Sequence, residues 1–429
     1  MSALEVIKRN AGLFILTLIV GGFIVILGLN FVVSDKVERT PDHLYGVEDP
    51  QFQHEMSLFF GTPIVDGNQV DYLHNGDEIF PAMLGAVREA EHFIAFETYI
   101  YWSEQIGREF ADALSERARA GVPVHVVIDA VGSNSMDENL LKAMQRAGVQ
   151  LHLYRPLHWY NLARINNRTH RKLLVVDGRI GFTGGVGVAD QWLGNAQDPK
   201  HWRDAHFRVQ GPAVLQMQAV FNDNWLQATG KVLHGPTYFP PTVSAGSARA
   251  QTFSSSPSSG SDSMRLMYLM AISSATREID IAASYFVPDH LTRATMIAAL
   301  RRGVRIRIVL PGEHMDAELV RHASRAHWGP LLREGAEIYE YQPTMFHTKV
   351  MTVDGIMTTV GSTNFDARSF GLNDEANLNV YDTSFAARMQ AVFEEDMKRS
   401  RRVTYDMWRT RPWKERLEER LAEPFSSQL

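Results

Sequence analysis

Two ten-residue stretches with the same pattern decide the fold: THRKLLVVDG at residues 169–178 and FHTKVMTVDG at residues 346–355. Each has the form His-x-Lys-x4-Asp-Gly, and a further glycine follows six residues later. His347 follows His170 by 177 residues, and every other position of the pattern keeps that interval. A pattern repeated in register over this distance indicates that the chain is a tandem duplication.

The segments before the two motifs repeat as well. Each half has an apolar run with the composition of a strand, then a helical stretch, then a second apolar run. These segments are 93–99, 106–120 and 122–128 in the first half, and 279–285, 291–302 and 304–310 in the second. Strands that alternate with helices at this spacing predict an α/β fold with a largely parallel sheet covered by helices on both faces.

The paired motifs also indicate the chemistry. Side chains two residues apart lie on the same face of a strand, so each His and its Lys are neighbours. An ammonium group neutralises phosphate charge and an imidazole can attack phosphorus, which makes the pair suited to a phosphate. One such pair would more simply be a solvated strand face. Two pairs in register favour a shared site, and if the halves pack across a pseudo-twofold axis, each motif supplies half of it.

The composition excludes several kinds of site. The chain has 429 residues, 45% of them hydrophobic, which predicts two or three domains, each with its own core. It has no cysteine, so disulfides, thiolate nucleophiles, zinc ribbons and iron–sulfur clusters are excluded. The 43 basic and 49 acidic residues give a net charge of −6, which provides no general attraction to nucleic acid.

The N-terminus predicts a membrane anchor at residues 1–34. Within it, Ala11 to Val33 contain only two polar side chains, Thr17 and Asn30. As a helix this stretch is ~34 Å long, against a hydrocarbon core of ~30 Å. A cleaved signal peptide is the alternative, but it needs a shorter apolar region and a small-x-small cleavage site. Two basic residues flank the stretch on each side, so charge does not determine its orientation.

The rest of the chain divides at changes of composition. We expect a juxtamembrane linker at 35–60, a first domain at 61–230, a linker rich in Pro, Ser and Gly at 231–263, and a second domain at 264–400. The tail at 401–429 is basic: residues 398–420 contain nine basic and four acidic residues together with two tryptophans. This composition is compatible with a solvated helix, but it favours contact with an anionic membrane surface. Nucleic acid would also suit Arg and Trp.

The paired motifs resemble those of the phospholipase D superfamily. The string GSTNFDARSFGLNDEANL at 361–378 resembles bacterial cardiolipin synthases, as do WRDAH at 202–206 and YFVPD at 285–289. The resemblance covers roughly residues 61–400. It implies an α/β fold with two tandem phospholipase D-like α-β-α sandwich domains related by pseudo-twofold symmetry, here preceded by one transmembrane helix.

What the resemblance implies for function is phosphatidyl transfer at a bacterial inner membrane. Two phosphatidylglycerol molecules would give cardiolipin and glycerol through a phosphatidyl-histidine, without a metal or other cofactor. Phosphatidylethanolamine is an alternative donor, and no nucleic acid partner is expected. A hydrolytic phospholipase D or nuclease of the same superfamily is the alternative activity, and a catalytically silent lipid-binding scaffold is a third possibility.

The resemblance also assigns roles to residues, with His170 as nucleophile and His347 as general acid and base. It implies that Lys172, Lys349, Ser362 and Asn364 hold the phosphoryl oxygens. Glu375 would orient a histidine in the second half; in the first half, the constant offset selects Asp198, but the sequence context favours Asp204. The motif carboxylates Asp177 and Asp354 complete the candidate catalytic set, although the glycine after each favours a turn residue bonded to its own backbone.

The two halves differ at two places near the motifs. The positions equivalent to Ser362 and Asn364 are Gly185 and Gly187 in the first half. Either the glycine N–H groups contact the phosphate there, or that side of the site binds it more weakly. The segment before His170 is also ten residues longer than its counterpart, and the apolar, aromatic extra residues fit a surface loop or a lipid contact equally well.

Overall fold

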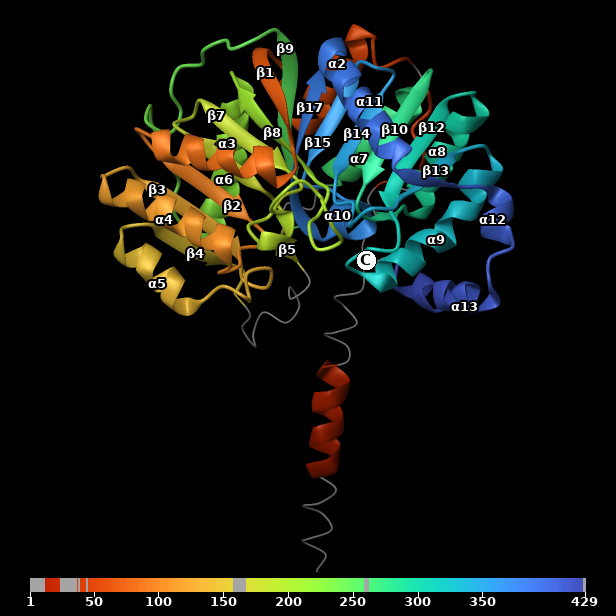
Figure 1. Cartoon of the computed structure of the whole chain (residues 1–429), viewed down its shortest axis with the longest axis horizontal. Coiled ribbons are helices and arrows are strands. Elements are labelled where there is room, and N and C mark those ends of the chain that lie inside the picture. Colours follow the sequence, from red (N-terminus) through yellow and green to blue (C-terminus); the bar gives the residue numbers. More distant parts are fainter. Residues whose placement is uncertain are drawn as a thin grey trace, which may run out of the picture.

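The chain folds into two similar α/β halves that share one continuous sheet (Figure 1). The structure is a computed structural model, and it describes residues 12–23, 37, 39–43, 45–156, 167–257 and 262–426. The strand order in the sheet is β18-β13-β12-β10-β14-β15-β17-β9-β1-β8-β7-β6-β2-β3-β4, with β5 paired to β17. A separate two-stranded sheet joins β11 and β16.

The first half contains eight strands and four α-helices within the described residues. Its strands are β1 (Val65–His74), β2 (Ile94–Thr98), β3 (Val124–Asp129), β4 (Gln150–Tyr154), β5 (Arg168–Thr169), β6 (Leu173–Val176), β7 (Ile180–Gly184) and β8 (Ala205–Gln210). Its helices are α3 (Asn75–Glu89), α4 (Gln105–Arg119), α5 (Glu138–Arg146) and α6 (Ala213–Thr229), with a 3₁₀ turn, η2, at Asp190–Trp192.

The second half repeats this order and adds elements at its end. Its strands are β9 (Ala248–Ser255), β10 (Glu278–Ala283), β11 (Phe286–Val287), β12 (Arg305–Pro311), β13 (Glu337–Tyr341), β14 (Lys349–Val353), β15 (Met357–Gly361), β16 (Phe365–Asp366), β17 (Asn373–Tyr381) and β18 (Ser400–Val403). Its helices are α7 (Ser263–Ser274), α8 (His290–Arg301), α9 (Glu318–Arg333), α10 (Ala367–Gly371), α11 (Thr383–Lys398), α12 (Tyr405–Arg409) and α13 (Trp413–Ala422), followed by the 3₁₀ turn η4 (Glu423–Phe425).

The sheet is mixed, so the prediction of a largely parallel sheet was wrong. Parallel pairing in each half joins β2, β3 and β4 in the first, and β10, β12 and β13 in the second, and the short β5 also pairs parallel with β17. The strands between them, from β14 to β6, pair antiparallel. The strand order is pseudo-symmetric about the junction of β9 and β1. Apart from β18, the order from β13 inward to β9 repeats the order from β4 inward to β1. The tandem α/β architecture is thus confirmed.

Asp-Gly turns account for the antiparallel pairing next to each motif. Asp177 and Gly178 have φ of 55° and 63°, and Asp354 and Gly355 have φ of 53° and 65°. The N–H of Arg179 donates to the carbonyl of Val176, and the N–H of Ile356 donates to the carbonyl of Val353. Two successive residues with positive φ form the tight turn that matches the twist of a β-hairpin, and Asp-Gly is a preferred sequence for it. The turns join β6 to β7 and β14 to β15.

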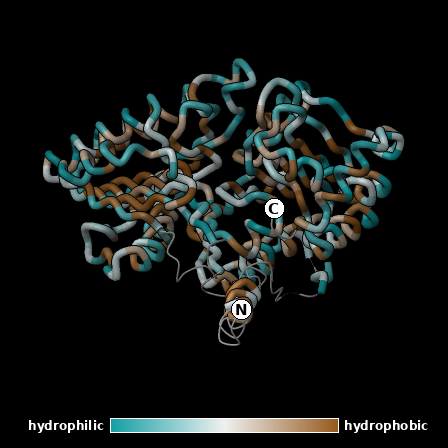
Figure 2. The backbone as a smooth tube through the Cα atoms, turned by 90° about the horizontal axis from the view of Figure 1, so that it is seen from below, coloured by the Kyte–Doolittle hydropathy of each residue, from teal (hydrophilic) through white to brown (hydrophobic). Residues whose placement is uncertain are grey.

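Helices cover the sheet on both faces in each half, as expected. In the first half α6 packs on β2, β4 and β6, while α3 and α4 pack together over the other face. In the second half α11 packs on β10, β12 and β14, and α7 and α8 lie on the opposite side. Figure 2 shows the hydrophobic segments of the first half concentrated in the strand layer between more hydrophilic helices.

Two predicted linkers contain elements of the folded core. The linker at 231–263 includes β9, which pairs with β17 on one side and β1 on the other and so joins the two halves. Most side chains of β9 are buried, and Ala250 and Phe253 pack into different hydrophobic clusters, whereas the Pro, Ser and Gly content of the segment had suggested a linker. The linker at 35–60 includes α2 (Pro50–Phe60), whose Phe52 and Met56 are fully buried in the core of the second half.

The basic tail at 401–429 is also largely part of the second half. β18 pairs antiparallel with β13, and α12 and α13 pack against α9. The buried Glu419 carboxylate accepts from Nε of Arg411 at 2.8 and 2.9 Å and lies 3.5 Å from Nε of Arg325. Arg325 of α9 therefore pairs with an acidic residue of the tail, while Arg401 of the tail pairs with Glu340 of β13 at 2.6 Å, and such ion pairs help to hold the tail on the second half.

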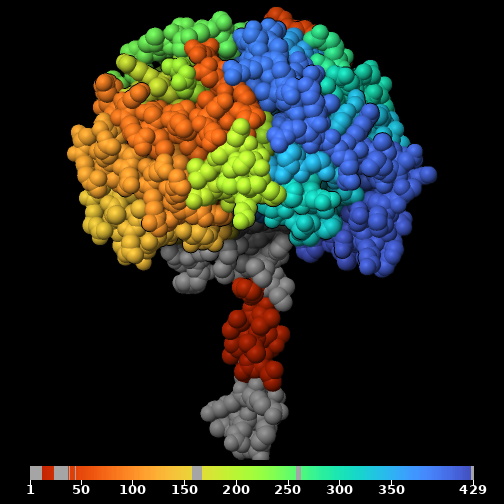
Figure 3. All heavy atoms as spheres, in the orientation of Figure 1, coloured from red at the N-terminus to blue at the C-terminus, as the bar shows by residue number. Residues whose placement is uncertain are grey.

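The apolar N-terminal segment is described only in part. Residues 12–23 form a helix whose side chains are exposed, and Figure 3 shows it standing clear of the two halves. In the part of the chain that the structure describes, no helix is both long and apolar enough to span a bilayer. Most of the remaining predicted span, 24–33, lies outside the described residues.

Candidate active site

Each motif is held at the start of its hairpin by backbone contacts with the other half. β5, immediately before His170, pairs with β17, and the N–H of His170 donates to the carbonyl of Asp374 at 2.9 Å. Correspondingly, the N–H of His347 donates to the carbonyl of Arg203 at 2.8 Å. Both histidines therefore lie at the junction of the halves.

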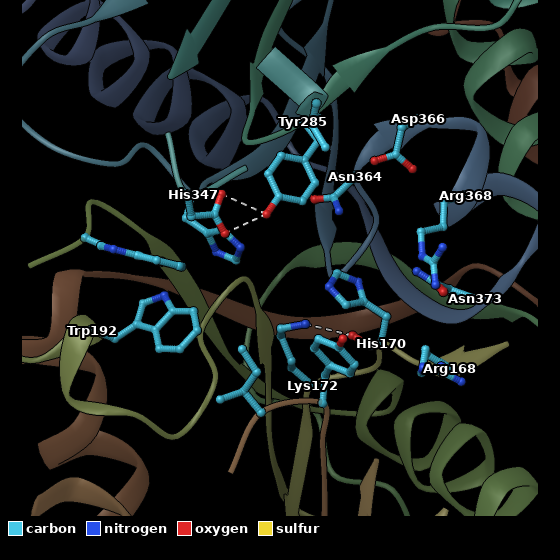
Figure 4. A pocket seen from close by; sticks show the side chains of 15 residues that line it. Arg168, His170, Lys172, Trp192, Tyr285, His347, Asn364, Asp366, Arg368 and Asn373 are labelled. Atoms are coloured by element: carbon cyan, nitrogen blue, oxygen red, sulfur yellow. Dashed lines mark hydrogen bonds between the residues drawn. The ribbon is translucent and has the colours of Figure 1, made fainter. Parts of the chain in front are cut away.

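The two motifs line one cavity, as the duplication predicted. Its volume is about 360 Å³, and His170, Lys172 and His347 all form part of its wall (Figure 4). The side chains around it are largely withdrawn from solvent, with 8% of His170 and 6% of His347 exposed. A cavity of this size accommodates a lipid headgroup rather than a whole lipid.

Each imidazole is fixed by a carboxylate from the opposite half. Nδ1 of His170 lies 3.0 and 3.1 Å from the two carboxylate oxygens of Glu375. Nδ1 of His347 lies 2.7 Å from Oδ2 of Asp204. The sequence had suggested that each carboxylate serves the histidine of its own half, and the structure shows the reverse pairing. A carboxylate at Nδ1 fixes the tautomer in which Nε2 carries the lone pair. In His347, Nζ of Lys349 lies 3.2 Å from this Nε2 atom.

Different side chains hold the two carboxylates. The Ser362 hydroxyl and the Asn373 amide donate to Glu375, whereas Nε1 of Trp192 donates to Asp204 at 2.9 Å. Ser362, expected to hold phosphoryl oxygens, is therefore directed at Glu375 and is fully buried. The constant offset between the halves could not identify Trp192, because the corresponding donor in the second half comes from a different element.

The glycine that replaces Ser362 in the first half makes room for the carboxylate. A Cβ atom on Gly185 would lie 2.2 Å from Oδ1 of Asp204. The N–H of Gly185 donates to the carbonyl of Ala205 at 3.1 Å, so it is not a phosphate ligand. At Gly187 a Cβ atom would meet the Trp192 ring at 3.2 Å. Of the two alternatives that the sequence left open, contact of the glycine N–H group with phosphate does not hold for Gly185.

The two lysines are placed alike. Nζ of Lys172 donates to the carbonyl of His170 at 2.9 Å, and Nζ of Lys349 donates to the carbonyl of His347 at 2.8 Å. Lys349 also donates to the Ser284 hydroxyl at 2.8 Å, which in turn donates to Oδ1 of Asn364 at 2.7 Å. Asn364 reaches the cavity wall, in agreement with its expected position.

The electrostatics are those of a site prepared for an anion. Burial, together with the neighbouring Lys349, lowers the pKa of Lys172 to about 7, and burial lowers the pKa of Lys349 to about 8. Burial likewise lowers the pKa of His170 to about 4 and that of His347 to about 3, so both imidazoles are neutral at pH 7. Two buried ammonium groups of like charge are stabilised when a phosphate binds between them.

The two partner carboxylates stay ionised despite their burial. Burial alone would raise the pKa of Glu375, but the contacts with His170 and Lys172 hold it below the ordinary value. For Asp204, burial is likewise outweighed by His347 and Lys349. Ionised carboxylates at both Nδ1 atoms can stabilise either imidazole in its protonated form during a reaction.

The motif aspartates lie outside the cavity. Asp177 accepts from the backbone N–H groups of Glu91, His92 and Phe93, at 2.7 to 2.9 Å. Asp354 accepts in the same way from residues 276–278. The two carboxylates therefore fix the segments that lead into β2 and β10. The sequence had suggested bonds to their own turn backbone instead. Neither carboxylate contacts a residue of the candidate site.

Other residues on the cavity wall were not assigned a role from the sequence. Beside His347, the Tyr285 hydroxyl lies 2.7 and 2.9 Å from the carboxylate oxygens of Asp316. On the side of His170, the wall includes Arg168 and Arg368 (Figure 4). Arg368 lies within the string 361–378, and Arg168 lies two residues before His170. Their positions near the motifs were the only sequence signal, because neither belongs to a pattern that indicates a chemical role.

Two further expectations concern the segment before the first motif and the binding of metal. The extra segment before the first motif, at 157–166, lies outside them. Within the described ranges, no group of three or more His, Asp or Glu side chains is arranged to hold a metal ion.

Comparison with known proteins connects this cavity to lipid chemistry. The family described as "Cardiolipin synthase, PLD-like domain" matches residues 83–225 and 268–397. The chain is 35% identical over 369 residues to cardiolipin synthase 1 of Bacillus cereus, covering 84% of this chain and 72% of that protein. It is 34% identical over 371 residues to a cardiolipin synthase of Geobacillus kaustophilus, covering 86% and 74%.

A solved structure supports the fold independently of sequence. The phosphatidylserine synthase of Haemophilus influenzae is similar with a TM-score of 0.65 at 12% identity, over 88% of this chain and all of that one. At this level of identity, the similarity concerns the fold alone and not the choice of lipid.

Proposed function

The chain belongs to the cardiolipin synthase family of phospholipase D-type phosphatidyltransferases, and we propose that it forms cardiolipin from two phosphatidylglycerol molecules through a phosphatidyl-histidine on His170. The observation that carries this mechanism is the pair of imidazoles in one cavity, each with Nδ1 held by a carboxylate so that Nε2 carries the lone pair.

In the first step Nε2 of His170 attacks the phosphorus of the donor phosphatidylglycerol. A P–N bond forms, the P–O bond to the glycerol headgroup breaks, and Nε2 of a protonated His347 gives its proton to the departing glycerol oxygen. The neutral state of His170 at pH 7 suits it to attack. His347 must gain a proton, which the bound phosphodiester and the ionised Asp204 favour electrostatically.

In the second step the roles reverse. His347 takes the proton from a headgroup hydroxyl of a second phosphatidylglycerol, whose oxygen attacks phosphorus while the P–N bond to His170 breaks. Cardiolipin and glycerol are the net products, and His347 ends protonated as it began. Lys172, Lys349 and Asn364 stabilise the charge on the phosphoryl oxygens in both steps.

Both substrates are lipids, so the site must work at a bilayer, and we place it at a bacterial cell membrane. The proposed anchor is the apolar segment 11–33; in its described part, helix 12–23, eight large apolar side chains are between 48% and 66% exposed. α13 provides a second contact, because Trp413, Leu417 and Leu421 recur every four residues on one exposed face. In Figure 1, helix 12–23, α13 and β5 all lie on the lower side of the molecule.

The experiment that tests the function uses vesicles of acyl-labelled phosphatidylglycerol and the full chain in detergent. Mass analysis should find cardiolipin carrying two labelled phosphatidyl groups together with free glycerol. The His170→Ala and His347→Ala variants serve as controls. Phosphatidic acid as the main product would show that water outcompetes the lipid hydroxyl and would assign the chain to hydrolysis instead. Replacing part of the lipid by phosphatidylethanolamine tests whether it acts as a donor.

A further inference from the structure

The cavity carries more positive charge than one phosphodiester needs. The two His-Lys pairs already supply the donor phosphate with two ammonium groups. Arg168 and Arg368 add two guanidinium groups to the wall on the side of His170, and the mechanism above uses neither. One comes from β5 of the first half and the other from α10 of the second, so, like the histidines, they are brought together only when the halves pack.

Two buried carboxyl groups interact electrostatically with these arginines, Asp129 with Arg168 and Asp366 with Arg368. Asp129 also accepts from the N–H groups of Val131, Gly132 and Thr169 at 2.9 to 3.0 Å. Asp366 also accepts from the N–H of Ser369 at 2.7 Å. Burial raises the pKa of Asp366 to about 7, and the charge of Arg368 opposes that increase.

Both arginines line the side of the cavity on which His170 lies (Figure 4). Burial lowers the pKa of Arg168; the charge of Asp129 opposes this effect, and repulsion from Arg368 adds to it. Two guanidinium groups in one cavity wall favour the binding of an anion. The planar fork of each group matches the oxygens of a phosphodiester better than an ammonium group does.

The opposite wall has different chemistry. There the Tyr285 hydroxyl donates to the Asp316 carboxylate, and Figure 4 shows Tyr285 on the side of His347, away from Arg168. A carboxyl group and a hydroxyl suit the hydroxyls of a glycerol headgroup and do not attract a phosphate. The cavity is therefore polarised, with phosphate-binding groups concentrated on one side.

The reaction requires a place for a second phosphate. The acceptor lipid carries its own phosphodiester, which is separated from the attacking hydroxyl only by the three carbons of glycerol, and the product carries both phosphates. When the first phosphate lies between the His-Lys pairs, the second must therefore lie in the same cavity. Ethanol or water as acceptor would bring no such group.

We propose that Arg168 and Arg368 form a second phosphate site that binds the phosphodiester of the acceptor lipid, and so select an anionic phospholipid over water or a neutral alcohol. This inference rests on the proposed function, since it names the acceptor of the same reaction. It makes the two arginines specificity-determining residues, separate from the groups that form and break the P–N bond.

The test compares two acceptors with one donor. The full chain in mixed micelles receives acyl-labelled phosphatidylglycerol, with or without ethanol, and cardiolipin and phosphatidylethanol are quantified together. In Arg168→Gln and Arg368→Gln, cardiolipin formation should fall about 10–100-fold, the effect of losing a hydrogen bond to a charged group. Phosphatidylethanol formation should fall less than about 3-fold, because the donor site is unchanged.

Matched variants separate charge from geometry. Arg368→Lys keeps the charge but loses the fork, and should restore cardiolipin formation in part. Arg119→Gln removes an exposed arginine on α4 and should change neither product. Phosphatidylethanol formation also reports that each variant is folded.

Two outcomes would overturn the proposal. If both products fall in parallel in the Gln variants, the arginines bind the donor; if neither falls, there is no second phosphate site. A wild-type chain that makes phosphatidylethanol but no cardiolipin would contradict the proposed function, and the acceptor site with it.

Discussion

Nδ1 of His170 lies 3.0 Å from Oε1 of Glu375, a residue 205 positions further along the chain. The reciprocal pair, His347 and Asp204, spans 143 positions in the other direction. Neither half can complete a histidine–carboxylate pair alone, so the active site exists only when both halves are folded and packed. The continuous sheet through β9 and β1 fixes that packing.

Neutralising either partner carboxylate should therefore reduce activity while the fold is kept. In Glu375→Gln and Asp204→Asn we expect kcat to fall by about 10²–10⁴, because an amide favours the wrong tautomer and no longer stabilises the imidazolium. Steady-state rates on phosphatidylglycerol and thermal unfolding would be measured on the same samples.

Asp198 provides the matched control. The constant offset between the halves selects it, but it pairs with His201 on the surface, at 2.9 Å. Asp198→Asn should keep nearly full activity. A large loss in this variant, with Asp204→Asn unaffected, would show that the offset identifies the functional carboxylate and that the crossed pairing does not matter for catalysis.

The two histidines should differ in labelling although both are essential. His170→Ala and His347→Ala should each lower turnover by more than the ~10²–10⁴ typical of one acid or base, because each removes half of a coupled cycle. Acid quenching of the wild-type reaction should trap a phosphatidyl adduct on His170. In His347→Ala, the adduct should accumulate only with a donor whose leaving group needs no proton.

Peptide mapping decides between the roles. An adduct on His347 would reverse the assignment and leave the composition of the site as proposed. If active wild-type protein never shows an adduct under either condition, direct displacement by the acceptor lipid replaces the two-step mechanism.

The pH dependence should be limited on the alkaline side by the lysines. Lys172 and Lys349 have pKa values of about 7 and about 8, and loss of their protons with rising pH removes the charge that binds phosphate. We expect kcat/KM, which reports the free enzyme, to decline more steeply above about pH 7, where loss of the lysine charge adds to the proton that His347 must gain. Because the pKa of His170 is about 4, the nucleophile itself stays neutral well below pH 7.

A lysine-to-arginine exchange tests this cause. Lys172 has the lower pKa and loses its proton first. Arginine stays protonated, so Lys172→Arg should move the alkaline limb of kcat/KM upward even if the altered geometry lowers the maximum. An alkaline limb at the same pH in this variant would assign it to another group.

The sequence predicted the parts of the site that depend on local pattern. The common interval of 177 residues was sufficient to place His170 and His347 in one cavity, because duplicated domains with a conserved register pack symmetrically. The Asp-Gly pairs carried a hairpin signal too, but the alternation of strands and helices was given more weight, and the antiparallel centre of the sheet was missed.

Contacts between the halves could not be predicted in the same way. Which carboxylate meets which imidazole depends on how the domains dock, and local sequence around Asp204 or Glu375 contains no information about it. Trp192 and Gly185 show the same limit. The Trp192 indole donates to Asp204 as the Ser362 hydroxyl donates to Glu375. Asp204 can lie there because residue 185 is a glycine with no side chain in that space. β9 was missed because the Pro, Ser and Gly content of its segment had suggested a linker.

The motif aspartates should matter for stability rather than for chemistry. Asp177→Ala leaves three backbone N–H groups without their acceptor and places alanine at a positive φ. Since two of these donors can reach water, we expect a loss of about 1–3 kcal/mol in the free energy of unfolding, with activity per folded molecule preserved.

Denaturant titration and specific activity at low temperature would check this. Asp177→Asn keeps one acceptor oxygen and tolerates the left-handed conformation, so it should lose less stability. A hundredfold loss of activity in a variant with unchanged stability would restore the catalytic interpretation of the motif aspartates.

The exposed face of α13 should contribute to membrane binding. Trp413 and Leu421 are both 64% exposed and Leu417 is 48% exposed, whereas Glu419 and Ala422 on the other face are buried against the second half. Lys414, Arg416 and Arg420 flank the apolar face, so the helix combines apolar side chains with positive charge, as expected for the interface of an anionic bilayer.

With Trp413, Leu417 and Leu421 all changed to Ser, the chain should bind phosphatidylglycerol vesicles more weakly in flotation assays. The loss should be largest in a chain lacking residues 1–34, which has no apolar anchor to compensate. Activity on short-chain phosphatidylglycerol below its critical micelle concentration should remain close to wild type, because α13 contributes no residue to the cavity. A control with Glu418, on the exposed surface of the same helix, changed to Gln should bind normally. If the triple variant floats as well as the parent in both backgrounds, α13 is a solvated surface helix.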